Sequence, residues 1–98
     1  MSKIPFADSA VQVARRYFVA QFPGSTVRDF FIHWSGDQGF AIEHQGAVLH
    51  TAVLTAEFLR DATVVDTQLS VWGVAEAMRQ TGTAEVLVDT TGIQIRSQ

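Results

Sequence analysis

Two histidines and two carboxylates are the residues of this chain that could do chemistry together. His33, His50, Glu43 and Asp29 fall in a segment where apolar and polar residues alternate as in β-strands, with Ala41 between them in the sequence. If the strands pair so that their apolar faces agree, the four polar side chains share one sheet face around Ala41. The sequence therefore predicts a ligand-binding surface on which two imidazoles and a carboxylate hold a polar ligand.

The composition argues against metal and cofactor chemistry. The two histidines lie on outer strands of a trio, about 9.5 Å apart, which is too wide for a single tight metal site. The chain contains no cysteine, which excludes disulfides, thiolate catalysis and cysteine-based metal sites. No glycine-rich phosphate loop or serine–histidine–acid pattern is present in the sequence. We expect no metal, no cofactor and no catalytic residue; a small-ligand-binding protein or weak enzyme that uses His33, Glu43 and His50 is the alternative.

The segment Val86–Gly92 resembles the hydrophobic-hydrophobic-Asp-Thr-Gly loop of aspartic proteases. An additional threonine separates Asp89 from the glycine of that pattern. Because aspartate commonly opens type I turns, we interpret Asp89 as a turn former.

Residues 55–96 have the order helix, turn, helix, hairpin, as in a winged helix-turn-helix domain. From Glu57 onward this segment carries six acidic residues against three arginines. A recognition helix needs cations or amides that reach phosphates and base edges. Nucleic acid is therefore the least favoured partner, although a winged-helix-like binder stays a third alternative.

The elements that must position these residues follow from hydrophobic periodicity. A helix is predicted over Phe6–Phe22, and a second helix, capped by Asp66 or Thr67, runs to about Gln80 and ends near Gly82. The apolar stripe of the first helix consists of Ala7, Val11, Ala14, Phe18 and Phe22. A closing hairpin places Val88 opposite Ile93, Val86 opposite Ile95, and Glu85 opposite Arg96.

The register of the first three strands follows from two predicted turns. A three-residue loop, Gly36–Gln38, sets Trp34 opposite Phe40 and Ile32 opposite Ile42, and a two-residue turn at Gln45-Gly46 sets Ile42 opposite Leu49. The predicted core face is Phe30, Ile32, Trp34, Phe40, Ile42, Leu49 and Val53. On the opposite face, Phe31, Val48 and Ala52 are interface candidates. Val48–Asp61 fits either a strand followed by a short helix, which we favour, or one helix.

The predicted fold is a single α+β domain, residues 1–98, with an antiparallel sheet and helices packed on it, in the order α-β-β-β-(short α)-α-β-β. The chain has 47% apolar and only 17% charged residues, with a net charge of −3. A surface so poor in charge is typical of proteins that associate, so a homodimer is expected. No apolar run approaches the length of a membrane span, and we expect a cytoplasmic protein.

This order of elements is similar to that of the acidic dimeric chaperones of type III secretion effectors. The resemblance lies in topology alone and carries no site residue. It implies a homodimer that acts on another protein. A small non-enzymatic protein-binding or adaptor domain is therefore the expected function.

Overall fold

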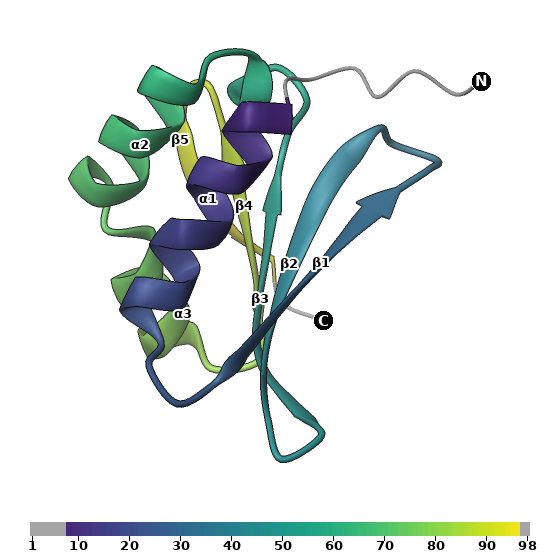
Figure 1. Ribbon diagram of the computed structural model, residues 1–98, viewed down its shortest axis with the longest axis vertical. Coiled ribbons are helices and arrows are strands. Elements are labelled where there is room, and N and C mark those ends of the chain that lie inside the picture. Colours follow the sequence, from purple (N-terminus) through teal and green to yellow (C-terminus); the bar gives the residue numbers. More distant parts are fainter. Residues whose placement is uncertain (1–7, 97–98) are drawn as a thin grey trace.

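Three helices cover one face of a five-stranded sheet in residues 8–96, the part of the chain that the computed structural model describes (Figure 1). Phe6 and Ala7 of the predicted first helix lie outside the described residues. The elements are α1 (Asp8–Gln21), β1 (Thr26–Ile32), β2 (Asp37–His44), β3 (Ala47–Leu54), the 3-10 helix η1 (Phe58–Arg60), α2 (Ala62–Val71), α3 (Val74–Thr81), β4 (Glu85–Asp89) and β5 (Gly92–Arg96). The predicted α+β class is confirmed.

The sheet has the order β1-β2-β3-β4-β5 and is mixed. Strands β1 to β3 form an antiparallel meander and β4–β5 an antiparallel hairpin, but β3 and β4 run parallel. Their connection passes through η1, α2 and α3, the helical crossover that parallel neighbours need. The sheet is therefore not wholly antiparallel as the sequence predicts, whereas the predicted β4–β5 pairs, including Val88 with Ile93, are confirmed.

The predicted register of β1 on β2 is wrong. A four-residue loop, residues 33–36, joins the strands, and it ends at Gly36, whose φ is +74° and whose N–H donates to the carbonyl oxygen of Ile32 at 2.8 Å. Ile32 therefore pairs with Asp37, five positions from the predicted partner Ile42. Because five is an odd number, the faces of β1 are exchanged, and Phe30 and Ile32 lie on the side away from the helices.

The predicted turn between β2 and β3 is confirmed, but the predicted register beyond it is wrong. Gln45 and Gly46 both have positive φ, 51° and 81°, as the short hairpin requires. A β-bulge then skips Leu49, so that Ile42 pairs with His50 and Phe40 with Ala52. The extra residue turns His50 and Ala52 toward the helices and Val53 away from them, and Leu49 of the predicted core is 39% exposed.

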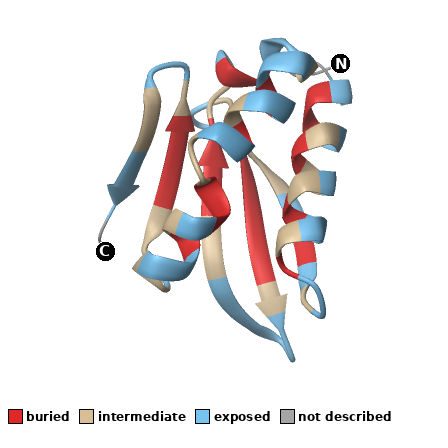
Figure 2. Ribbon diagram, turned by 90° about the vertical axis from the view of Figure 1, so that its left-hand side faces the viewer, coloured by how far each residue is buried: buried red, intermediate tan, exposed pale blue. Residues whose placement is uncertain are grey.

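The core lies between the helices and the sheet, where buried residues face one another (Figure 2). Phe18 of α1 packs on Phe40 of β2 with ring centroids 5.0 Å apart. Ile42 is fully buried beside them, as predicted. The described part of the predicted α1 stripe is buried as well: Val11, Ala14, Phe18 and Phe22.

The predicted second helix is divided in two. Gly73 has a left-handed φ of +62°, which ends α2 and begins α3. The N-cap of α2 is Asp61, whose Oδ1 accepts the N–H of Thr63 at 2.9 Å, so the predicted caps at Asp66 and Thr67 are wrong. Residues Val48–Asp61 form a strand and then a short helical turn, the favoured of the two predictions.

Candidate functional site

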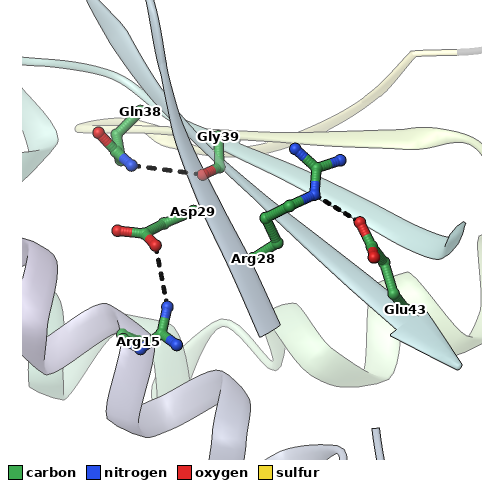
Figure 3. Close-up of polar contacts among 6 residues, drawn as sticks. All are labelled: Arg15, Arg28, Asp29, Gln38, Gly39 and Glu43. Carbon is green, nitrogen blue, oxygen red and sulfur yellow. Dashed lines mark hydrogen bonds and ion pairs between the residues drawn. The ribbon is translucent and has the colours of Figure 1, made fainter. Parts of the chain in front are cut away.

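The two predicted acidic ligands lie on opposite faces of the sheet (Figure 3). Asp29 points toward the helices, where its Oδ1 is 2.9 Å from Nη1 of Arg15 on α1. Glu43 lies on the uncovered face and pairs with Nε of Arg28. Each carboxylate thus neutralises an arginine, and the two do not converge.

The two predicted histidines lie at opposite ends of the meander. His50 faces the helices, with Nδ1 2.9 Å from the carbonyl oxygen of Gly82 and its ring 5.3 Å from that of Phe22. A contact with a carbonyl oxygen requires Nδ1 to carry the proton. His33 lies in the β1–β2 loop, with its ring edge-on to Phe31.

The strand positions separate these histidines widely. Ile42 pairs with both His50 and Val27, and His33 is six residues after Val27, just beyond the end of β1. Six residues of strand span about 20 Å. The structure therefore does not bring Asp29, His33, Glu43 and His50 together around Ala41.

The three interface candidates do not share one surface. Ala52 is fully buried under the helices, Phe31 is partly buried, and Val48 is exposed near the β2–β3 turn. Ala52 lies on the inner face because of the β-bulge, which reverses the predicted orientation of β3.

The Asp89 carboxylate organises the β4–β5 turn. Its Oδ1 accepts the hydroxyl of Thr91 at 2.6 Å, the N–H of Thr91 at 2.8 Å and the N–H of Gly92 at 3.1 Å. These hydrogen bonds, that of the Thr91 hydroxyl first, hold the pKa of Asp89 below its ordinary value. Asp89 is a turn former, as predicted. Among residues 8–96, no cluster of three histidine or carboxylate side chains could hold a metal.

A hollow between α1 and α2 does not indicate a ligand. It measures about 590 Å³ and is lined by Val13, Arg16, Tyr17, Ala62, Thr63 and Asp66. Arg16 and Asp66 bring opposite charges to it, and both are exposed. The hydroxyl of Tyr17 accepts the N–H of Ala75 at 3.0 Å, which ties α1 to α3. The hollow is therefore a surface groove between packed helices.

A smaller cleft on the uncovered sheet face has the character of a binding surface. We call it the tryptophan cleft; its lining is Ile32, Trp34, Ser35, Asp37, Val53, Glu85 and Arg96, and its volume is about 150 Å³. Trp34 is 90% exposed, whereas Val53 is buried. Opposite Trp34, Arg96 and Glu85 form an ion pair of 3.3 Å.

Sequence reasoning missed this cleft because it assigned Trp34 to the core opposite Phe40. The available signal was the Ser35-Gly36 pair that follows the tryptophan, a combination typical of loops. A loop that included Trp34 would have placed it outside the strand.

No protein-family model matches this chain, and neither a curated protein nor a solved structure is significantly similar to it. Within residues 8–96, no helix has the length and apolar character to cross a membrane. Function must therefore be argued from the surfaces of this chain.

Proposed function

We propose that this chain is a small, non-enzymatic protein-binding domain of the cytoplasm that acts as a homodimer and contacts a partner protein through the tryptophan cleft. The observation that carries the proposal is Trp34, a large aromatic side chain left 90% exposed beside a cleft. Tryptophan is strongly enriched among the residues that dominate protein–protein binding energy. The cytoplasm is proposed because a chain without cysteine needs no oxidising compartment to fold.

The cleft has three apolar and four polar or charged lining residues, a mixed surface that favours contact with a partner protein over a reacting substrate. Its aromatic wall, aliphatic floor and charged rim follow the usual anatomy of a protein interface. The rim charges of Glu85 and Arg96 already satisfy each other. Elsewhere, Asp29 and Glu43 pair with arginines and His50 with a carbonyl oxygen. Asp29, Glu43 and His50 thus stabilise the fold, and none of the three lines the cleft.

Affinity capture from the native host with three variants tests this proposal. Trp34→Ser should lose the proteins that the native chain recovers, whereas Trp34→Phe should retain part of them because it keeps an aromatic surface. Val19→Ser is the matched control, since Val19 is also exposed but lies on α1. Each variant should unfold within about 0.5 kcal/mol of the native protein, as surface changes do. Equal recovery with native protein and Trp34→Ser would refute the role of the cleft.

A further inference from the structure

The two edge strands of the sheet differ in how they are protected. β1 carries Arg28 and Asp29 near its middle, and charged side chains discourage a second strand from pairing with an edge. β5 has the sequence Gly-Ile-Gln-Ile-Arg, with no charge before Arg96 and no proline. It is the outermost strand in Figure 2 and is coloured as intermediate or exposed throughout. β5 is therefore the edge that is open to another strand.

The surface beside β5 is apolar on the helix side. Ile95 is 46% exposed and pairs with Val86, a core residue, so it points to the side that the helices cover. On α2, Val65 and Leu69 enter the core, whereas Val64 and Val71 are exposed, Val71 by 69%. Helix α2 therefore has apolar side chains on a second, exposed face that the core does not bury.

A groove connects this outer face of α2 to the β4–β5 turn. Its volume is about 180 Å³, and its lining combines Phe58, Val64, Gln68, Trp72 and Thr90 with the charged residues Glu57, Arg60 and Asp61 at the start of α2. The ring of Trp72 stacks near that of Phe58 at 5.8 Å, which fixes the apolar wall. The exposed valines and β5 thus belong to one side of the molecule.

The sequence of β5 is complementary to itself when two copies run antiparallel. With Gln94 of one copy opposite Gln94 of the second, Ile95 faces Ile93 of the second copy, and Ile93 faces its Ile95. Arg96 then lies opposite Gly92 of the second copy, so the two arginines do not meet. Apolar pairs across strands stabilise such a contact, and like charges would oppose it.

Charge also favours this edge. Each copy carries a net charge of −3, so two copies repel where their acidic residues approach. Residues 67–75 carry no charge, and neither do residues 90–95. The C-terminal half of α2, after the exposed Asp66, and the edge strand up to Ile95 therefore bring no acidic residue to a contact between two acidic chains.

We propose that the homodimer forms by antiparallel pairing of β5 with β5 of a second copy, centred on Gln94, with the exposed face of α2 adding apolar contact. This inference rests on the proposed homodimer and specifies its interface. Pairing of edges satisfies main-chain groups that water otherwise solvates and produces one continuous ten-stranded sheet from two sheets of five.

A single cysteine at the proposed two-fold axis tests the register. The chain has no native cysteine, so Gln94→Cys introduces the sole thiol. Residues directly opposite in antiparallel strands have Cα atoms about 4.5–5.5 Å apart, within the range of a disulfide. Mild oxidation should convert Gln94→Cys to a covalent dimer at protein concentrations where Val19→Cys, an exposed α1 control, stays largely monomeric.

Light scattering over a concentration series completes the test. The native protein should dimerise, and Ile95→Lys should raise the midpoint concentration by about tenfold or more, because it places a cation in the apolar contact. Val19→Lys should leave the midpoint unchanged. A native protein that is monomeric throughout would refute the homodimer itself. A native dimer that Ile95→Lys leaves intact, with no faster cross-linking of Gln94→Cys than of Val19→Cys, would refute only the β5 interface.

Discussion

A substitution at the contact between Phe30 and Gly39 tests most directly how β1 and β2 pair. The two residues are direct partners across the strands, on the face without helices. A Cβ atom added at Gly39 would lie 2.3 Å from Cε2 and Cζ of Phe30, far inside van der Waals contact. The aromatic ring therefore rests on the glycine backbone, an arrangement that compensates for glycine in a strand.

Gly39→Ala should destabilise the protein, and the sign of its effect should depend on Phe30. In the native background the ring must leave its position, at a cost of about 1–3 kcal/mol, the range for overpacking. Without a clash, alanine is favoured over glycine in a strand by about 0.5–1 kcal/mol. In a Phe30→Ala background Gly39→Ala should therefore be stabilising. The expected coupling between the two changes is about 1.5–4 kcal/mol.

Urea unfolding of the native protein, both single variants and the double variant measures this coupling. Gly46→Ala, made in the same two backgrounds, is the control. Gly46 has a φ of +81° and open space around it, so the cost of alanine there is backbone strain alone and should be independent of Phe30. If the effect of Gly39→Ala agrees within about 0.5 kcal/mol in both backgrounds, the ring does not lie on Gly39 and the register is refuted.

The remaining predictions concern the core and the β4–β5 turn. Ile42→Ala, at a fully buried position, should lower the free energy of unfolding in urea by about 2–5 kcal/mol. Ile32→Ala should lower it by about 1 kcal/mol, because Ile32 is only partly buried on the other face. Equal losses would contradict the exchanged faces of β1. Because the Asp89 pKa is lowered in the folded protein, its charged form adds stability above the unfolded pKa of about 3.9, and this stability is lost as the pH falls through the lower folded pKa. Asp89→Asn should therefore be less stable at neutral pH and lose less stability on acidification, and an Asp89 pKa at or above the ordinary value in carboxyl NMR titration would oppose this account.

The parts of the fold that local patterns determine could be predicted from the sequence. The three-and-four spacing of Val11, Ala14 and Phe18 defines one helix face whatever lies around it. The β4–β5 register follows from a tight turn closed by Asp89, which fixes every later pair. In both cases the physical cause lies within a few residues of its effect.

The sequence did not show which side chains of the first three strands point toward the helices. That orientation depends on the number of residues in the β1–β2 loop and on the β-bulge in β3. Phe30, Phe31 and Ile32 are all apolar, so the pattern of β1 is compatible with either face inward. One additional loop residue or one bulged residue reverses the orientation of every side chain that follows. The predicted ligand site combined residues from before and after the β1–β2 loop and the β-bulge. It therefore required both the loop length and the register of β3 to be correct.

The exchanged faces also explain why a partner is a reasonable expectation for this fold. Phe30, Ile32, Val53 and Leu87 lie on the sheet face that no helix of residues 8–96 covers, so that face has an apolar centre, in which neighbouring side chains bury Val53 and Leu87. If β5 pairs about a two-fold axis, the axis is perpendicular to the sheet, and both uncovered faces point the same way. The two tryptophan clefts of such a dimer would then open on one side of a continuous sheet. A partner with two suitable anchors could occupy both at once, and the second contact would form at a high effective concentration. The proposed interface and the proposed binding cleft are therefore compatible: the first uses the edge of the sheet, and the second uses its face.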